Sequence, residues 1–406
     1  MKPFLIENGR EYSYETLVQD INRDSFYCPL LQTNDLYLFF VNLVKALSCN
    51  QPVVLLDSDL KGEEISGIDL SLINNEETIP DYKCITTIEE VIEKLIHSSS
   101  KITIFTSGTT GQPKQVTHSV SSLTRAVRIG DKYQGQIWAF AYNPTHMAGL
   151  QVFFQAFVNQ NLIINVFNQN RQDVYRLIDQ YQITHISGTP TFYRLLLPFE
   201  RTFESVARVT LGGEKSDNHL HESIKKIFPN SKINNVYAST EAGSLFAAKG
   251  DSFQIPSTIR DKFKIEDDEL LIHKSLLGQS ESFDFIGDYY RSGDLIEWID
   301  KDNSIFRFKS RKNELINVGG YKVNPSEIES VILGIEGVQQ VVVYGRPNSI
   351  LGNVLCADIQ MDPQITIDEF EIRRHLKTQL QDFKIPRRIK FVDKLSLTRT
   401  GKIKRI

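Results

Sequence analysis

Apolar residues along this chain have helical spacing in some segments and form short, strand-like runs in others. The two kinds of segment alternate. The run 35–48 predicts a helix, and the short apolar run 52–56 after it predicts a buried strand. A second helix is predicted by apolar residues spaced i, i+3, i+4 and i+7, namely Val174, Leu177, Ile178 and Tyr181. Further strands are expected at 102–105, 137–142, 162–166 and 184–187. Strands that alternate with helices favour an α/β architecture.

The last quarter of the chain has a different pattern, typical of a small α+β unit. Ser326 and Glu329 have the spacing of a capping box, which predicts the start of a helix. The pattern then predicts a strand, a helix and a final strand, at 341–343, 372–380 and 389–392. A charged stretch, 309–314, precedes this unit. We therefore expect a large N-terminal α/β domain with layered sheets and helices at 1–310, a hinge at 311–314 and a small C-terminal α+β domain at 315–406.

Composition narrows the class of protein. The chain has 406 residues and a net charge of −4, a balance that gives no reason to expect nucleic acid or an anionic membrane as a partner. The apolar run 36–47 is interrupted by Asn42 and Lys45 and is shorter than the roughly 20 residues that span a bilayer. None of the four cysteines forms a Cys-x-x-Cys pair, and the start of the chain has no signal-peptide pattern. We expect a cytoplasmic protein with reduced cysteines.

The strongest chemical signal is a hydroxyl- and glycine-rich segment directly after the strand 102–105. It consists of Thr106, Ser107, Gly108, Thr109, Thr110, Gly111, Gln112, Pro113 and Lys114. Hydroxyl and backbone N–H groups can surround a polyphosphate, glycines permit close approach, and Lys114 adds positive charge. A helix is expected to begin near His118 and Ser119. The segment lacks the Gly-x-x-x-x-Gly-Lys-Ser/Thr pattern, which disfavours an ordinary P-loop kinase or GTPase; a polar surface loop is the plain alternative.

This segment resembles the Ser/Thr/Gly-rich loop, ending in Pro-Lys, of the adenylate-forming superfamily. That family contains acyl- and aryl-CoA ligases, the adenylation domains of peptide synthetases and firefly luciferase. Further segments resemble its motifs in the same order, at 237–241, 290–294, 310–329 and 400–403. The resemblance covers most of the chain after residue 100 and is closest to a stand-alone acyl-CoA ligase with a shortened N-terminal region. Two positions depart from the pattern: Ala238 replaces the usual Gly, and Asn313 stands where Asp or Lys is common.

The resemblance implies an ATP-dependent, AMP-forming ligase that joins a small carboxylic acid to a thiol. The carboxylate attacks the α-phosphorus of ATP, pyrophosphate leaves, and the acyl group passes to CoA or to the phosphopantetheine thiol of a free-standing carrier protein. Because two anions meet, catalysis depends on positioning and charge neutralisation. A degenerate ATP- or AMP-binding sensor is the alternative. The presence of Lys114, Glu241, Asp294 and Lys402 argues against it.

The same resemblance implies roles for individual residues. Glu241, helped by Thr240, is expected to bind Mg²⁺ together with the phosphates. Tyr237 is expected to stack on adenine, and Asp294 and Arg311 to hold the ribose. The full set expected to contact ATP or AMP is Thr106, Ser107, Gly108, Thr109, Thr110, Gly111, Lys114, Gly213, Glu214, Tyr237, Ala238, Ser239, Thr240, Asp294 and Arg311.

Three further roles complete the expected site. Lys402 is expected to be the catalytic lysine that contacts the carboxylate and the α-phosphate, although a basic tail is the plain alternative. His146 is expected to border the acyl site and gate the substrate. Gly319 and Gly320 are expected to leave room for a pantetheine arm once the mobile C-terminal domain swings about the hinge. The acyl pocket is expected around His146 and at 188–191 and 238–244, with Phe192 and Tyr193 as pocket or core residues.

Overall fold

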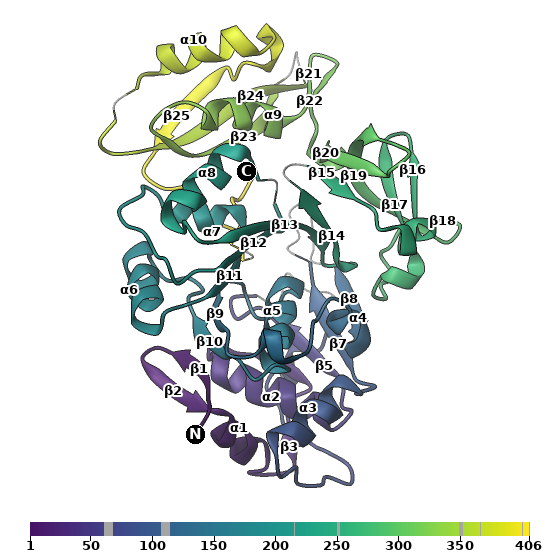
Figure 1. The fold of residues 1–406 in the computed structure, drawn as a ribbon. Coiled ribbons are helices and arrows are strands. Elements are labelled where there is room, and N and C mark those ends of the chain that lie inside the picture. Colours follow the sequence, from purple (N-terminus) through teal and green to yellow (C-terminus); the bar gives the residue numbers. More distant parts are fainter. Residues whose placement is uncertain are drawn as a thin grey trace.

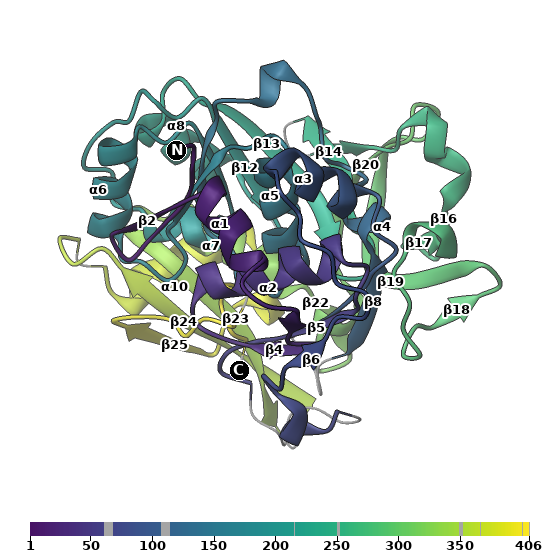
Figure 2. The same cartoon turned by 90° about the horizontal axis from the view of Figure 1, so that it is seen from below.

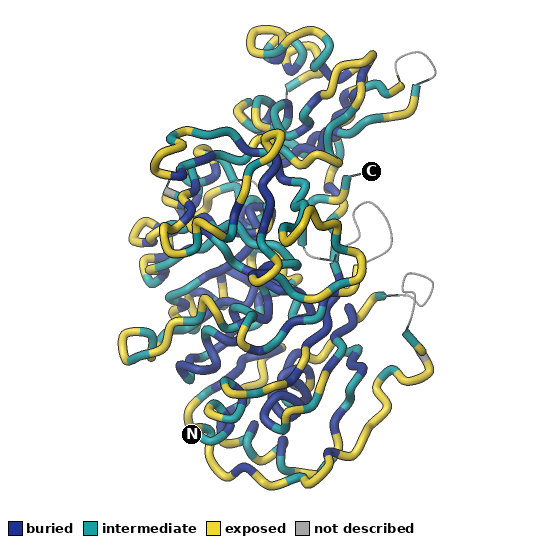
Figure 3. The backbone as a smooth tube through the Cα atoms, turned by 90° about the vertical axis from the view of Figure 1, so that its right-hand side faces the viewer, coloured by how far each residue is buried: buried dark blue, intermediate teal, exposed yellow. Residues whose placement is uncertain are grey.

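The computed structural model describes residues 1–60, 68–106, 114–214, 216–249, 252–348, 352–365, 367–399 and 401–405. A large α/β part fills the lower two thirds of Figure 1, and a smaller α+β part lies above it. The expected fold class is therefore confirmed. Buried backbone is concentrated in the middle of the large part, whereas the exposed segments lie mostly at its edges (Figure 3). None of the described helices is long and apolar enough to cross a membrane.

Six parallel strands form the centre of the large sheet. Their order is β13 (Lys232–Ser239), β12 (Arg208–Gly212), β11 (His185–Gly188), β9 (Ile137–Phe140), β10 (Leu162–Asn165) and β1 (Pro3–Glu7), with β2 (Arg10–Ser13) antiparallel at the edge. Because the strands are parallel, their carboxyl ends meet at one edge, where ligands bind in open α/β sheets. The segments that follow β9, β11, β12 and β13 therefore lie together.

Helices cover both faces of this sheet, which agrees with the burial of consecutive residues along strands such as β9 and β11. Trp138 and Phe140 of β9 pack into the core with α1 (Tyr14–Ile21), α2 (Leu36–Ser48) and α5 (Met147–Phe157). Ala139 and Ala141 point to the opposite core, which includes α6 (Arg171–Tyr181), α7 (Pro190–Leu195) and α8 (Asn218–Ile227). Figure 1 shows the two sets of helices on opposite sides of the strands. The predicted helices at 35–48 and 174–181 are confirmed.

A smaller sheet supports the hydroxyl-rich segment. It has the order β4 (Leu30–Gln32), β5 (Val53–Leu56), β7 (Lys101–Phe105) and β8 (Gln115–Ser119), with α3 (Ile88–Ile96) and α4 (Val120–Thr124) beside it and β3 (Phe26–Tyr27) paired to β6 (Glu77–Thr78). The helix start expected near 118–119 is confirmed, although both of these residues still belong to strand β8. The helix begins at Val120, where the Ser119 hydroxyl caps it by accepting from the backbone N–H of Ser122 at 3.2 Å.

An antiparallel region that the sequence pattern did not predict extends the large sheet. It contains β14 (Gly243–Lys249), β15 (Ser252–Gln254), β16 (Phe263–Glu266), β17 (Glu269–His273), β18 (Phe285–Ile286), β19 (Tyr289–Asp300) and β20 (Ile305–Arg311). Aromatic rings from several of these strands fill its own core, including Phe246, Phe253, Phe263 and Phe306. Figure 2 shows β16, β17 and β18 projecting to one side of the N-terminal helices. This region contributes Asp294 and Arg311 to the candidate site.

The chain leaves β20 at Arg311 and enters the C-terminal unit through a 3₁₀ turn, η6 (Lys312–Glu314). That unit contains β21 (Ile316–Val318), β22 (Tyr321–Val323), α9 (Pro325–Leu333), β23 (Val338–Asn348), β24 (Gly352–Met361), α10 (Glu369–Gln379) and β25 (Arg388–Val392). Within the described residues, further 3₁₀ turns are η2 (Leu70–Leu72), η3 (Asp131–Tyr133), η4 (Ser257–Lys262), η5 (Lys274–Leu276) and η7 (Asp382–Lys384). The division at 310 and 315 and the hinge between them stay a prediction.

The predicted capping box of Ser326 and Glu329 is wrong. The N-cap of α9 is Asn324, whose side chain accepts from the Ser326 backbone N–H at 3.1 Å, and Pro325 takes the first helical position. Glu329 therefore lies one turn inside the helix, where it accepts from the Val343 backbone N–H at 2.8 Å. A capping box does occur at α10, between Asp368 and Glu371.

Candidate active site

One cavity of about 1290 Å³ lies at the carboxyl edge of the parallel strands. Its walls come from α5, β13, β14, the β19–β20 region and the C-terminal tail. The predicted site residues that line it are Thr106, Lys114, His146, Gly213, Ala238, Ser239, Thr240, Glu241, Arg311 and Lys402. Those not in its lining are Glu214, Tyr237, Asp294, Gly319 and Gly320. Ser107, Gly108, Thr109, Thr110 and Gly111 fall outside the described residues.

The ends of the hydroxyl-rich segment are held together at the cavity wall. The Thr106 backbone N–H donates to the Lys114 carbonyl at 2.9 Å, and the Lys114 N–H donates to the Thr106 hydroxyl oxygen at 2.9 Å. Both residues line the cavity, and Lys114 is exposed within it. A lysine at the base of this segment can therefore supply positive charge to an anion in the cavity.

Thr240 and Glu241 follow β13 and provide the oxygen ligands that Mg²⁺ prefers. Among the described residues there is no cluster of three or more His, Cys, Asp or Glu side chains suited to a metal ion. One carboxylate and one hydroxyl fit an ion that arrives with phosphate oxygens, and they do not form a metal cage of their own. The donor set thus fits the predicted role of Glu241 and Thr240.

His118 fixes the Thr240 segment, a role that the sequence did not reveal. Its Nε2 lies 2.8 Å from the Thr240 carbonyl oxygen and its Nδ1 lies 3.2 Å from the Ser122 hydroxyl. Burial lowers the pKa of His118 to about 4, so the ring is neutral near pH 7. A neutral ring can donate from Nε2 to the carbonyl, which ties β8 to the segment that carries Glu241. The two residues are 122 positions apart, so no local motif marks this pair.

Asp294 is the buried centre of a short hydrogen-bonded chain. Its Oδ2 accepts from the Tyr237 hydroxyl at 2.5 Å, and its Oδ1 accepts from Nε of Arg311 at 2.8 Å. The Asp294 carboxylate raises the pKa of Arg311 further above its ordinary value. The Tyr237 ring stacks on Phe308, with ring centroids 4.5 Å apart. Adenine stacking on Tyr237 and ribose binding by Asp294 and Arg311 stay predictions.

Lys402 enters the cavity from the C-terminal unit. A Cβ atom placed on Gly213 would lie 3.4 Å from its Cε, so the lysine packs directly against the backbone that follows β12. Burial lowers the pKa of Lys402, while the nearby Glu214 carboxylate acts to raise it. Glu214 is itself held at the start of α7, where its carboxylate accepts from the Thr191 N–H at 2.9 Å and from the Thr191 hydroxyl at 3.1 Å.

The tail that carries Lys402 touches both parts of the molecule. Arg399 pairs with Asp59 of the large part at 2.8 Å, and the Thr189 hydroxyl donates to the Gly401 carbonyl at 3.3 Å. On the other side, Arg405 forms a bidentate ion pair with Glu329 of α9 at 2.6 and 2.9 Å. The Gly319–Gly320 turn between β21 and β22 is outside the cavity lining in this arrangement.

His146 precedes α5 and its imidazole is held by a buried carboxylate that the sequence did not reveal. Nε2 of His146 lies 3.1 Å from Oδ2 of Asp57, and Oδ1 of Asp57 accepts from the Thr145 hydroxyl and, at 3.0 Å, from the Asn143 amide. Burial acts to raise the pKa of Asp57, but His146, Thr145 and Arg399 outweigh it and hold the pKa below its ordinary value. Asp57 directly follows the buried strand β5, which is the signal that could have identified it.

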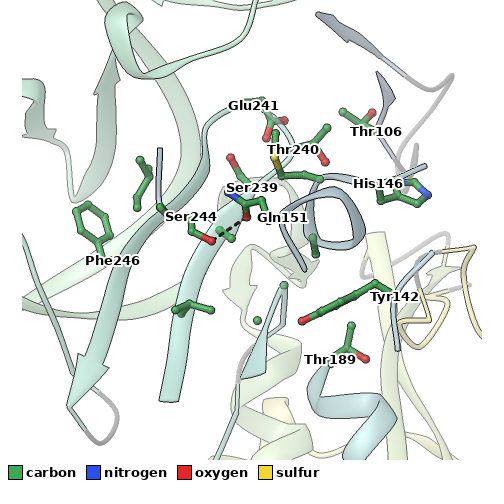
Figure 4. A pocket seen from close by; sticks show the side chains of 18 of the residues that line it. Thr106, Tyr142, His146, Gln151, Thr189, Ser239, Thr240, Glu241, Ser244 and Phe246 are labelled. Carbon is green, nitrogen blue, oxygen red and sulfur yellow. Dashed lines mark hydrogen bonds between the residues drawn. The ribbon is translucent and has the colours of Figure 1, made fainter. Parts of the chain in front are cut away.

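Residues of α5 and β14 form the remaining walls of the cavity: Met147, Gln151 and Val152 from α5, and Ser244 and Phe246 from β14. Figure 4 shows Gln151 directly beside Ser244. Thr189 and Ala238 also line the cavity, so the segments expected to form the pocket are represented there. Tyr193 is a core residue, because it is 1% exposed and its hydroxyl donates to the Ile186 carbonyl at 3.0 Å.

Comparisons with known proteins agree with this arrangement. Residues 52–267 match the AMP-binding enzyme family, and residues 327–402 match the AMP-binding enzyme C-terminal domain. A 2-succinylbenzoate–CoA ligase of Listeria monocytogenes is 28% identical over 324 residues, which cover 74% of this chain and 68% of that protein.

Solved structures show the same fold over the whole chain. ATP-bound MatB from Rhodopseudomonas palustris matches with a TM-score of 0.74 at 16% identity, covering 99% of this chain and 94% of that one. The O-succinylbenzoate coenzyme A synthetase MenE from Bacillus subtilis, in complex with ATP and magnesium, matches with a TM-score of 0.71 at 19% identity, covering 100% and 96%. With its two family segments in order and its motif residues around one cavity, the chain belongs to the adenylate-forming superfamily of AMP-binding enzymes.

Proposed function

We propose that the protein is an AMP-forming acid–CoA ligase. It activates a carboxylic acid with ATP and Mg²⁺, releases pyrophosphate, and passes the acyl group from the acyl-adenylate to the thiol of CoA. The observation that carries the proposal is that Lys402 of the C-terminal unit lines the same cavity as Lys114 and Glu241 of the large domain. The relatives named as CoA ligases and synthetases support CoA as the acceptor.

The first half-reaction needs charge neutralisation more than acid–base chemistry. An ionised carboxylate needs no general base, so the residues must bring two anions together and stabilise the charge that develops. Lys114 supplies positive charge at the base of the hydroxyl-rich segment, and Lys402 supplies it beside Gly213. Glu241 and Thr240 would hold Mg²⁺, which supplies further neutralisation of the phosphate oxygens when bound. Asp294 and Arg311 orient the nucleotide through the ribose.

The second half-reaction needs the thiol to reach the acyl carbonyl. The thiolate sulfur forms the new bond to the carbonyl carbon, and AMP leaves with the electron pair of the broken acyl–phosphate bond. For this step the C-terminal unit swings about 311–314, withdrawing Lys402 and bringing the Gly319–Gly320 turn to the cavity. For this movement the tail releases contacts to the large part, such as the Arg399–Asp59 ion pair and the hydrogen bond from Thr189 to the Gly401 carbonyl.

The same chemistry serves a carrier-protein acceptor, whose phosphopantetheine has the same thiol as CoA. Part of this chain also matches tyrocidine synthase 3 of Brevibacillus parabrevis, at 25% identity over 352 residues. We take CoA as the acceptor, because the chain covers 68% of the Listeria CoA ligase and the match spans 5% of the synthase. A cytoplasmic setting, where both ATP and CoA are available, completes the proposal.

The test has two stages on the purified chain. Acid-dependent ATP–pyrophosphate exchange is measured with Mg²⁺ across aryl, short, medium and hydroxy acids, and the active acids are then incubated with CoA or a carrier protein. We expect one acid class to stimulate exchange and to yield the CoA thioester. If the thioester formed on the carrier protein and not on CoA, the acceptor would be the carrier protein. ATP binding without exchange for any acid would contradict the ligase and favour the sensor.

A further inference from the structure

The geometry points to a substrate that carries a hydroxyl or carbonyl oxygen along its chain, recognised by Gln151 and Ser244. This inference rests on the proposed function and names the class of acid that the same site activates. The two residues come from α5 and β14 and lie side by side in the wall of the part of the cavity expected to hold the acyl group (Figure 4). Neither has a charge, so together they distinguish a neutral oxygen from a plain hydrocarbon chain.

The Gln151 amide is oriented by its neighbour. The Ser244 hydroxyl donates to Oε1 of Gln151 at 2.9 Å, which fixes the amide and leaves its two N–H groups for another acceptor. No residue in the described part of the chain accepts from the Gln151 amide nitrogen. The Ser244 oxygen retains lone pairs, so a substrate hydroxyl can accept from Gln151 and donate to Ser244.

Gly243 provides the space for this amide. A Cβ atom on Gly243 would lie 2.9 Å from Nε2 of Gln151 and 3.5 Å from the sulfur of Met147. Its φ of +69° also lies in the region that L side chains rarely adopt. The glycine therefore gives the polar end of Gln151 a place at the cavity wall, beside Ser244.

The residues around Gln151 and Ser244 are apolar, so a hydrogen bond from the pair to a substrate contributes more to binding than it would in water. Met147, Val152, Leu245 and Phe246 line the cavity next to it. An amide covered by a hydrocarbon chain in such surroundings loses its water partners without replacement, which weakens binding of that chain. An oxygen on the substrate removes that cost, so the pair favours an oxygen-bearing acid over its carbon isostere.

Position along the cavity agrees with this reading. Ser244 pairs with Ala238 across the β13–β14 ladder, and Ala238 is followed by Ser239, Thr240 and Glu241. The Gln151–Ser244 pair therefore lies next to the segment 239–241, which would hold Mg²⁺, on the side of the cavity expected to hold the acyl group. Arg128 also lines the cavity but is exposed, with its backbone N–H donating to the Gln155 side chain at 2.9 Å. A second carboxylate on the substrate would need Arg128 and not the neutral pair.

The experiment compares matched acids in ATP–pyrophosphate exchange. One pair is γ-hydroxybutyrate and pentanoate, which exchanges a hydroxyl for a methyl group. The other is β-benzoylpropionate and γ-phenylbutyrate, which exchanges a carbonyl for a methylene. For the parent chain, we expect the oxygen-bearing acid of at least one pair to have a kcat/KM higher by about tenfold or more. We expect Gln151→Leu to reduce that ratio to near one, and Ser244→Ala to reduce it partly. Met147→Leu is the control, because it changes the wall without removing a hydrogen bond.

The outcomes separate the two levels of the proposal. Equal kcat/KM values within both pairs, in a parent chain that adenylates them, would overturn the role of Gln151 and Ser244 and leave the ligase intact. A preference for a dicarboxylic acid that is lost in Arg128→Gln would overturn it in favour of a charged partner. Exchange with no acid at all would overturn the ligase, and this inference with it. Circular dichroism would show whether a variant fails to fold. In that case the comparison of matched acids on the parent chain still tests the proposal.

Discussion

Oδ2 of Asp57 lies 3.1 Å from Nε2 of His146, and the two residues are 8% and 7% exposed. Asp57 follows strand β5 of the small sheet, whereas His146 precedes helix α5, which packs on the large sheet. The contact therefore fixes a cavity-lining ring across the seam between two sheets. Nδ1 of His146 is buried without a hydrogen-bond partner among the described residues, so the orientation of the ring depends on Asp57.

Asp57→Asn should weaken the use of the acid more than the use of ATP. The amide has one oxygen in place of two, so it can accept either from His146 or from Thr145 and Asn143, but not from both sides at once. We expect kcat/KM for the acid to fall by about tenfold, since a lost buried, charge-assisted hydrogen bond costs about 1.5–3 kcal/mol, with the KM for ATP little changed. Steady-state kinetics with each substrate varied in turn measures this. An equal loss for both substrates would indicate general destabilisation. Asp131→Asn is the control, because that side chain is exposed and does not line the cavity.

His118→Gln should remove part of the loss of stability in acid. Burial depresses the pKa of His118 from 6.5 in its ordinary state to about 4, so between these values the unfolded chain binds a proton that the folded chain does not. The contribution of neutral His118 to the free energy of unfolding is therefore fully present above the unfolded-state pKa. It is lost as the pH falls from 6.5 towards 4. Urea unfolding at pH 7.5 and pH 5 should show the parent losing about 2 kcal/mol more than the variant. The same pH dependence in both proteins would contradict the neutral His118.

Lys402→Ala should stop adenylation while leaving ATP bound. The lysine enters the cavity beside Gly213, where the acid and ATP are expected to meet. ATP affinity should persist, because the other predicted ATP contacts come from the large domain. We expect exchange to fall by a factor of about 100 or more, as when one group that stabilises developing charge is removed. Calorimetry should show ATP affinity within a few-fold of the parent. Lys404→Ala is the matched control, because that side chain is exposed two residues away. Equal exchange in Lys402→Ala and the parent would exclude the catalytic role.

Arg405→Ala should reduce adenylation by releasing the tail. Arg405 holds the segment after Lys402 to α9 through Glu329, and its guanidinium also donates to the Val343 carbonyl at 3.0 Å. Without it, Lys402 samples positions away from the acid, and we expect a fall of roughly tenfold in exchange. Arg405→Lys should restore part of the loss, because a lysine keeps the charge and loses the bidentate geometry. Thioesterification of a supplied acyl-adenylate should change less, since that step does not use Lys402.

Sequence patterns predicted the parallel core well, because buried strands such as 102–105 and 162–166 are short apolar runs. They did not predict β19 (Tyr289–Asp300), most of whose residues are only partly buried, so no apolar period marks it. The motifs identified the residues around the cavity, since Glu241 and Lys402 lie in characteristic local sequences. They did not identify Asp57, Gln151 or His118, whose roles depend on partners 89, 93 and 122 positions away.

The β7–β8 hairpin has an electrostatic consequence. Because the chain continues from Lys114 into a strand, the first helix after the hydroxyl-rich segment is α4, which has 5 residues and begins at Val120 with its N-terminus capped by Ser119. A long helix dipole aimed at the phosphates, as in loops that lead directly into a helix, is missing from this part of the described chain. In the proposed reaction, side-chain cations and Mg²⁺ then balance most of the triphosphate charge. One of those cations, Lys402, belongs to the C-terminal unit that we propose to swing away. We therefore expect domain movement and pyrophosphate departure to be coupled, since each changes the charge that the other must balance.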